Sequence, residues 1–209
     1  MNIDVKKYKL SIKNYVPIDS KKSQIVIGNT LNDNMRHYIG WTTKLNGNYK
    51  KTAAFTISRD GEIYQHFNPK YFSKFFGENN NLNTKSIVIL LENYGYLFKH
   101  YEKNVFITWN GDIYKEQDLV VEKRWRGQQF WAEYTDQQLE SLVELVRSLC
   151  ERFNIPSLTI GHNTKVSQLE GFKGVLYKSN LESYYSDPNP NLDYEMIKTK
   201  IEEYEREDY

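Results

Sequence analysis

Two runs of consecutive apolar residues predict strands that are buried on both faces. Residues 23–30 (SQIVIGNT) contain an uninterrupted Ile-Val-Ile run, and residues 85–93 (KSIVILLEN) repeat the pattern. Such β-branched runs are typical of strands in a sheet that helices cover on both sides. A third stretch, residues 157–164 (SLTIGHNT), predicts a last strand that ends at a histidine.

Alternation of polar and apolar residues predicts two hairpins. In residues 53–67 (AAFTISRDGEIYQHF) the alternation runs on either side of Asp60-Gly61, and residues 106–116 (FITWNGDIYKE) repeat it around Asn110-Gly111. Asp-Gly and Asn-Gly favour the tight turns that join antiparallel strands.

Helical periodicity is clearest in residues 135–153. Thr135 is suited to the N-cap, and Gln138 three residues later completes a capping box. One apolar stripe follows at helical spacing, formed by Leu139, Leu142, Val143, Val146, Leu149, Cys150 and Phe153. A shorter helix is predicted within residues 33–46 and a charged one within residues 194–207.

These elements predict a single α/β domain with a central mixed sheet and flanking helices. We expect an N-terminal arm at residues 1–22 and a domain at residues 23–190, with an extended hairpin insertion at residues 94–134. Residues 191–209 are expected to form a C-terminal helix.

Charge and composition exclude several classes of function. A net charge of +1 over 209 residues argues against a nucleic-acid-binding surface. The single cysteine excludes an intramolecular disulfide and a cysteine-rich zinc cluster. No apolar run approaches the roughly 18 residues of a membrane span, and the N-terminal residues do not form a secretory signal. We therefore expect a cytoplasmic protein without a membrane partner.

The order of these elements resembles the zinc-dependent N-acetylmuramoyl-L-alanine amidases (type 2), the group shared by phage lysins and peptidoglycan recognition proteins. The resemblance covers roughly residues 23–195 and combines five pieces that are weak singly. They are the early strand, the hairpin FTISRDGEIYQ, the stretch FFGENNNLNTKSIVILLEN, the capped helix with its NIP ending and IGHNT, and the closing YSDPNPNLDYE.

The resemblance implies a zinc ion with three protein ligands and a water molecule at the fourth position. Such a metal polarises the amide carbonyl and lowers the pKa of the bound water. The second ligand position falls on His162 and the third on Asp187. The first, a histidine after the early strand, falls on Gly28. The neighbouring Asn29 offers only a neutral amide oxygen, a weak donor for zinc, and is a candidate for contacting substrate instead.

Other positions also depart from the family pattern. The residue before the hairpin that often lines the site falls on Ala53, and a family histidine falls around Phe75. The lysine two residues before the last ligand falls on Tyr185. The usual acidic position falls on Leu90, which leaves Glu92 as the carboxylate best placed for a general base.

Each implied ligand has an ordinary structural interpretation as well. His162 is equally consistent with a strand-end histidine bonded to the backbone, and Asp187 before Pro188 with a turn former. His37 is the nearby histidine that offers itself as a substitute ligand, although its place on a helix favours a solvated side chain.

The segment 94–134 is rich in aromatic residues. Arg124, Trp125, Arg126 and Trp131 predict a wall that binds substrate, because aromatic faces bind sugar rings and arginines bind carboxylates. The same residues are equally consistent with packing of the insertion onto the sheet, or with a contact to a protein partner.

For function, the resemblance implies recognition or cleavage of the lactyl-peptide amide of peptidoglycan in a phage or a bacterium. The partner is then peptidoglycan or a protein, and a phage product would act in the host cytoplasm or the virion. Zinc is the implied cofactor, but Gly28 argues against it. The alternative is a non-catalytic pseudo-amidase that serves as a cell-wall-binding, virion or protein-interaction module.

Overall fold

A central six-stranded sheet forms the core of the computed structural model, which describes residues 1–162, 171–181 and 184–203. Its strand order is β1-β4-β3-β5-β2-β10. The strands are β1 (Ile3–Asp4), β4 (Ile63–Gln65), β3 (Phe55–Ile57), β5 (Ser86–Leu91), β2 (Gln24–Asn29) and β10 (Gly174–Tyr177). The predicted mixed α/β class is confirmed, and the two apolar runs are the central strands β2 and β5.

The register of the sheet brings three residues into one row. β2 pairs in parallel with β5, so that Gly28 lies opposite Leu90, and β3 pairs in parallel with β5, so that Thr56 also lies opposite Leu90. Residues in one row of a parallel sheet project to the same face. Gly28, Leu90 and Thr56 therefore face the same side of the sheet.

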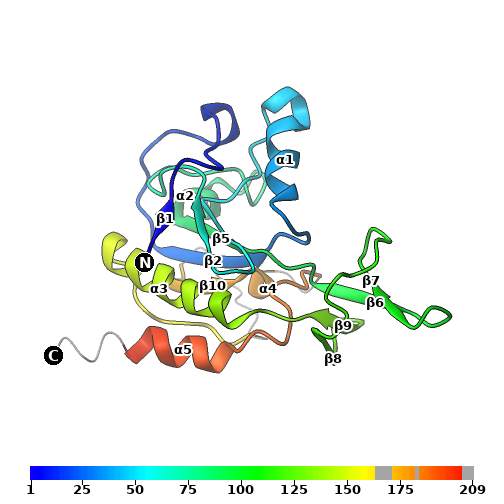
Figure 1. Ribbon diagram of the computed structural model, residues 1–209. Coiled ribbons are helices and arrows are strands. Elements are labelled where there is room, and N and C mark those ends of the chain that lie inside the picture. Colours follow the sequence, from blue (N-terminus) through cyan, green and yellow to red (C-terminus); the bar gives the residue numbers. More distant parts are fainter. Residues whose placement is uncertain (163–170, 182–183, 204–209) are drawn as a thin grey trace.

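Helices cover both faces of this sheet (Figure 1). α3 (Asp136–Phe153) and α5 (Tyr194–Glu203) lie on one side, whereas α1 (Arg36–Thr43) and α2 (Asn80–Lys85) lie on the other (Figure 1). The short α4 (Lys178–Leu181) directly follows β10. Two 3₁₀ turns, Ile12–Asn14 and Lys44–Gly47, complete the helical elements of the described part. None of the helices in that part is both long and apolar enough to cross a membrane.

The predicted long helix is confirmed as α3, but only half of its capping box forms. The Thr135 side chain accepts a hydrogen bond from the Gln138 backbone N–H at 3.3 Å. The Gln138 side chain does not return this bond. Its Nε2 donates instead to the carbonyls of Ile57 and Glu92, at 3.0 and 3.1 Å, and so ties the start of α3 to the ends of β3 and β5.

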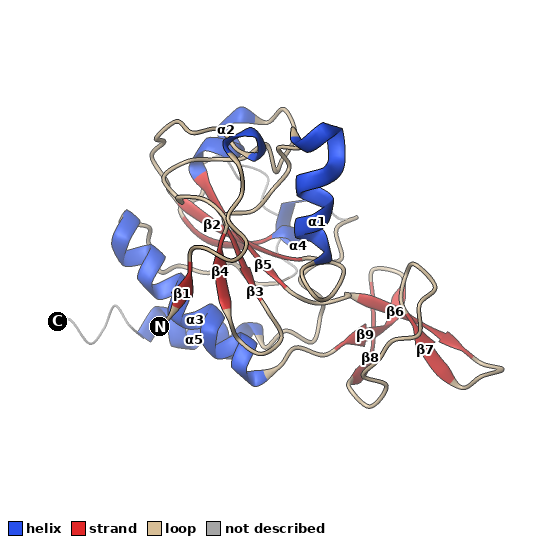
Figure 2. Ribbon diagram, turned by 45° about the horizontal axis from the view of Figure 1, so that its top comes forward, coloured by secondary structure: helices blue, strands red, loops and turns tan. Residues whose placement is uncertain are grey.

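The predicted hairpin around Asp60-Gly61 is confirmed as β3 and β4, which pair antiparallel. The insertion is more than a hairpin. It forms a second sheet of four strands in the order β7-β6-β9-β8, which projects from one side of the molecule (Figure 2). Its strands are β6 (Tyr96–His100), β7 (Val105–Ile107), β8 (Val120–Trp125) and β9 (Gln128–Ala132). After Asn110-Gly111 the return side of the second predicted hairpin contributes only a bridge between Ile107 and Ile113.

Side chains from the rest of the molecule hold this inserted sheet at the end of β9. Asn93 Nδ2 donates to the carbonyls of Ala132 and Glu133, at 3.2 and 3.1 Å. Asn189 Nδ2 donates to the Ala132 carbonyl at 2.9 Å, and Arg59 Nη1 donates to the Glu133 carbonyl at 2.8 Å. All of these attachments end on main-chain oxygens.

The strand predicted at residues 157–164 is wrong for the residues that the structure describes. Thr159 makes a single parallel bridge to Val175, and the place beside β2 belongs to β10, which the sequence pattern did not predict. The side chains of β10 are fully buried, whereas Leu158 is 54% exposed. Burial on both faces therefore selects the later segment. Residues 163 and 164 of the predicted strand lie outside the described residues.

Candidate functional site

The end of β2 forms a small cradle because residue 28 has no side chain. A Cβ atom at Gly28 would lie 3.0 Å from Asp187 Oδ2, 3.2 Å from Leu90 Cδ2 and 3.3 Å from Lys178 Cδ. These distances are shorter than ordinary van der Waals contact. The space that a side chain of residue 28 would need is therefore filled by neighbouring groups.

Asp187 fills this cradle as a buried, fully engaged carboxylate. Its residue is 3% exposed, and its Oδ2 accepts a hydrogen bond from the Asn29 backbone N–H at 3.0 Å. Lys178 Nζ donates to both carboxylate oxygens, at 3.0 and 3.1 Å. Because a buried charge needs a counter-charge, the ammonium group is what keeps this carboxylate stable in the interior.

Lys178 reaches the cradle between two aromatic rings. Its Nζ lies 4.5 Å from the ring centre of Tyr185 and 5.9 Å from that of Phe75, and its side chain is 16% exposed. An ammonium group within about 6 Å of a ring centre is attracted by the ring's negative face. The rings and the carboxylate together form a pocket for a single positive charge.

His162 is held by aromatic stacking. Its ring lies 3.9 Å from the ring centre of Tyr194 and 4.5 Å from that of Trp125. Burial, followed by the charges of Arg126 and Lys123, lowers the pKa of His162 to about 4. The Nε2 atom is buried and finds no hydrogen-bond partner among the residues that the structure describes. The rings of Trp125 and Tyr194 therefore hold the His162 ring in place, and its role as a metal ligand stays a prediction.

Asn29, predicted to contact substrate, is 5% exposed, and its hydrogen bonds hold the segment 187–189. Its side-chain Oδ1 accepts a hydrogen bond from the Tyr134 hydroxyl at 2.9 Å. The same hydroxyl accepts one from the Asn189 backbone N–H at 3.0 Å. Together with its backbone bond to Asp187, Asn29 therefore fixes the chain around residues 187–189 against the end of β2.

The expectation of a solvated His37 is wrong, because this histidine belongs to a buried polar chain. It is 8% exposed, and His66 is fully buried. His66 Nδ1 lies 2.8 Å from the Tyr8 carbonyl, which can only accept, so Nδ1 carries the proton. The Thr56 hydroxyl then donates to His66 Nε2 at 2.8 Å and accepts from His37 Nε2 at 3.0 Å.

This arrangement keeps both histidines neutral. Burial, with a smaller contribution from His66, lowers the pKa of His37 to about 3. Burial also lowers the pKa of His66 to about 4, although the Tyr8 carbonyl acts in the opposite direction. The Nε2 atom of His37 is thus engaged by Thr56, and its Nδ1 atom lies 3.4 Å from Asn32 Oδ1.

Glu92 lies in a different place, on the wall of a cavity of about 480 Å³. The residue is 5% exposed, its Oε1 accepts a hydrogen bond from the Met35 backbone N–H at 2.6 Å, and burial raises the pKa of its carboxyl group. Neither Gly28 nor Asp187 lines this cavity. Four tyrosines do: Tyr8, Tyr64, Tyr94 and Tyr114.

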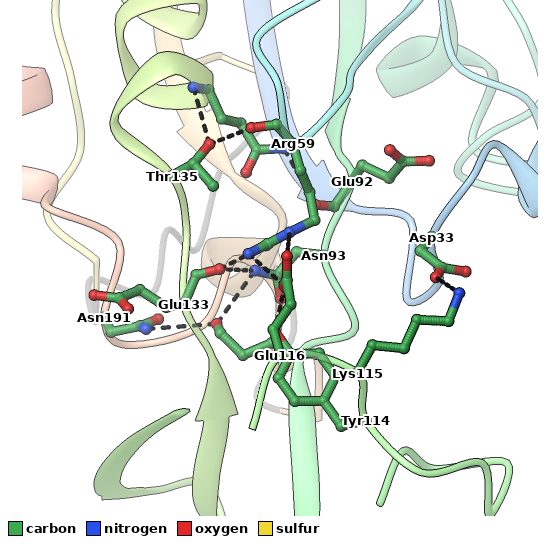
Figure 3. A network of polar contacts seen from close by, with 12 residues as sticks. Asp33, Arg59, Glu92, Asn93, Tyr114, Lys115, Glu116, Glu133, Thr135 and Asn191 are labelled. Carbon is green, nitrogen blue, oxygen red and sulfur yellow. Dashed lines mark hydrogen bonds and ion pairs between the residues drawn. The ribbon is translucent and has the colours of Figure 1, made fainter. Parts of the chain in front are cut away.

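Ion pairs that bridge the main body and the insertion frame this cavity (Figure 3). Lys115 Nζ lies 3.5 Å from Asp33 Oδ2, and Arg59 Nη2 lies 2.6 Å from Glu116 Oε2. The Thr135 hydroxyl donates to the Arg59 carbonyl, so the N-cap of α3 also fixes the position of this arginine (Figure 3).

The aromatic segment divides into packing and surface residues. Trp131 is fully buried, and its Nε1 donates to the Lys123 carbonyl at 2.6 Å, which matches the packing interpretation and leaves no face for a sugar. Arg126 lies over the Trp125 ring and donates to the carbonyls of Ser179 and Tyr185. Arg124 is exposed and Trp125 half-buried, so these two remain on the surface.

Comparison with protein-family models assigns this sequence to a known protein family. Residues 19–172 match the model of Amidase_2, N-acetylmuramoyl-L-alanine amidase. The chain belongs to this amidase family. A comparison with curated protein sequences gives no match.

Solved structures of amidases share the fold of this family member. The amidase LysC from Clostridium intestinale URNW is 18% identical over 96% of this chain and 97% of its own, with a TM-score of 0.54. The catalytic domain of XlyA is 16% identical over 96% and 99%, with a TM-score of 0.56. AmiD from E. coli, in complex with anhydro-N-acetylmuramic acid-L-Ala-D-gamma-Glu-L-Lys, is 15% identical over 88% and 59%, with a TM-score of 0.55.

The residues at the end of β2 do not fit the zinc ion that an amidase of this family implies. Zinc needs at least three donors from histidine, cysteine or carboxylate side chains, about 2.0–2.3 Å away. Gly28 supplies none, and both oxygens of Asp187 accept from Lys178. Within residues 1–162, 171–181 and 184–203, no group of three such side chains is placed to hold a metal.

Sequence reasoning about this member of the amidase family missed Lys178. Three positions that depart from the pattern implied by the resemblance surround this lysine: the rings of Phe75 and Tyr185 face its ammonium group, and a Cβ atom at Gly28 would lie 3.3 Å from its Cδ. Lys178 follows a strand that the hydrophobic pattern did not reveal, so its place next to Asp187 required the structure.

Proposed function

We propose that this amidase-family protein, from a phage or a bacterium, binds peptidoglycan without cleaving the lactyl-peptide amide by zinc chemistry. The observation that carries the proposal is the state of Asp187. Its carboxylate is neutralised by Lys178, and the neighbouring position 28 offers no donor. An amide carbonyl at the end of β2 would therefore meet no polarising metal, and no activated water would be formed there.

Two surfaces are available for a peptidoglycan fragment. The cavity beside Glu92 has a volume of about 480 Å³ and offers tyrosine rings together with charges of both signs. Tyrosines suit such a ligand because they combine an apolar ring, which packs on sugars, with a hydroxyl that forms hydrogen bonds. The second surface is in the aromatic segment, with the exposed Arg124 and the half-buried Trp125, whose ring also contacts Arg126 and His162. The amidase AmiD, solved with a muropeptide fragment, supports peptidoglycan as the class of ligand.

The proposal is tested by measuring hydrolysis and binding separately. Hydrolysis is followed as peptide release from purified muropeptides with and without added zinc, and binding as co-sedimentation with insoluble peptidoglycan. Tyr94→Ala changes the cavity wall, and Trp125→Ala changes the aromatic segment. Tyr101→Ala serves as the matched control, because Tyr101 is 76% exposed between β6 and β7.

We expect binding without hydrolysis, weakened about tenfold or more by one of the two site variants and unchanged by Tyr101→Ala. The variant that weakens binding identifies which surface is used. Zinc-dependent peptide release by the unchanged protein contradicts the proposal. Failure of the protein to sediment with peptidoglycan contradicts the binding part of the proposal and favours a protein partner.

A further inference from the structure

We propose that the Lys178 ammonium group is the resident cation of this amidase-type site and stands where the family places its metal. The inference concerns the same site as the proposed function, but it depends only on the contacts of Lys178. The inference states why three of the altered positions occur together: each of the three makes room for, or holds, a single lysine side chain.

Three altered positions converge on this lysine. The missing side chain at Gly28 leaves space for Lys178 Cδ, which would lie 3.3 Å from a Cβ atom there. The rings at Phe75 and Tyr185 face its ammonium group at 5.9 and 4.5 Å. A histidine at position 75 or a lysine at position 185 would supply a metal-site nitrogen or a second positive charge instead. Aromatic faces at these two positions attract the ammonium group, whereas a second positive charge would repel it.

The carboxylate that the family uses as a ligand retains a cationic partner. Asp187 is 3% exposed, and Lys178 Nζ contacts both of its oxygens at 3.0 and 3.1 Å. A carboxylate this deeply buried requires a cation, whether a metal ion or an ammonium group. Lys178 satisfies this requirement within the chain. A divalent ion cannot reach Asp187 unless the ammonium group leaves.

The first experiment removes the Lys178 ammonium group by mutation and adds a soluble alkylammonium ion in its place. Lys178→Ala should lower Tm by about 6–20 °C, because it leaves the Asp187 carboxylate buried without a partner. Propylammonium chloride should recover part of this loss, whereas sodium chloride at the same ionic strength should not. Lys178→Ala/Asp187→Asn is the matched control, since without the carboxylate the amine has nothing to neutralise. The unchanged protein should not respond to the amine.

The second experiment asks whether the lysine excludes a metal. We expect the unchanged protein and Gly28→His to retain no zinc after dialysis. The double variant Gly28→His/Lys178→Ala should retain zinc, which should raise its Tm. Addition of EDTA should abolish that rise. If that double variant does not fold, Lys178→Ala alone decides: zinc should raise its Tm, and should not raise that of Lys178→Ala/Asp187→Asn.

Two results would overturn the inference. One is stoichiometric zinc in the protein while Lys178 is present. The other is a Lys178→Ala variant that is as stable as the unchanged protein and indifferent to both amine and zinc. Neither experiment uses peptidoglycan, so a failure to bind the cell wall refutes the proposed function and leaves this inference standing.

Discussion

The cradle at the end of β2 predicts an unusual response to the smallest possible substitution, Gly28→Ala. The added Cβ would lie 3.0 Å from Asp187 Oδ2, 3.2 Å from Leu90 Cδ2 and 3.3 Å from Lys178 Cδ. Overpacking of this kind costs about 1–3 kcal/mol. Alanine also restricts the unfolded chain, which returns about 0.4–1 kcal/mol of stability. At the midpoints of these ranges the net loss should be about 1.3 kcal/mol, which corresponds to a fall in Tm of about 3–5 °C.

Gly40→Ala is the matched control, because it makes the same chemical change in α1. There the nearest heavy atom to the added Cβ is Lys44 Cε at 3.8 Å, an ordinary contact. Alanine favours a helix over glycine by about 0.5–1 kcal/mol, so this variant should gain stability. Urea denaturation followed by tryptophan fluorescence measures both. If Gly28→Ala proves as stable as the unchanged protein, the ion pair does not fill the cradle as described.

Three further predictions concern stability. His37 and His66 have folded pKa values of about 3 and about 4, below the ordinary 6.5, so the unfolded chain takes up protons first as the pH falls. Stability should therefore fall as the pH drops below 6.5, down to about pH 4 for His66 and about pH 3 for His37, by up to about 1.4 kcal/mol per pH unit for each histidine, and His66→Gln should reduce the slope in urea titrations. Trp131→Ala should cost about 3–5 kcal/mol in the same assay, because the ring is fully buried; a small loss would contradict its packing role. Thr135→Ala should cost about 1 kcal/mol by removing the N-cap of α3, and an unchanged midpoint would show that the cap is dispensable.

The sequence predicted those parts of the fold that local patterns determine. β2 and β5 are buried on both faces and show it as unbroken apolar runs, and α3 shows its buried stripe and its N-cap directly. The hairpin of β3 and β4 was visible because Asp60-Gly61 marks the turn. In each of these cases the residues that decide the structure lie close together along the chain.

The rest depended on contacts between distant segments. β10 was missed because four residues carry little periodicity, and its choice over residues 157–160 depends on which segment the sheet buries. The burial of His37 depends on Thr56 and His66, which lie on another element. The resemblance paired Asp187 with position 28, and the structure places these two residues side by side, whereas the role of Asp187 as a metal ligand stays a prediction. The resemblance did not point to Lys178.

The attachment of the inserted sheet to the main body affects how the surface of that sheet can vary in sequence. Asn93, Asn189 and Arg59 all hold it through the carbonyls of Ala132 and Glu133. Every amino acid provides a main-chain carbonyl, so the anchoring geometry does not depend on which side chains the two residues carry. Ala132 itself is fully buried, so the positions free to vary are the exposed ones farther out on the sheet, where substitutions can alter its surface while this attachment stays the same. The three donors, which belong to the main body, are constrained by this attachment, as are Lys115 and Glu116 by their ion pairs with Asp33 and Arg59.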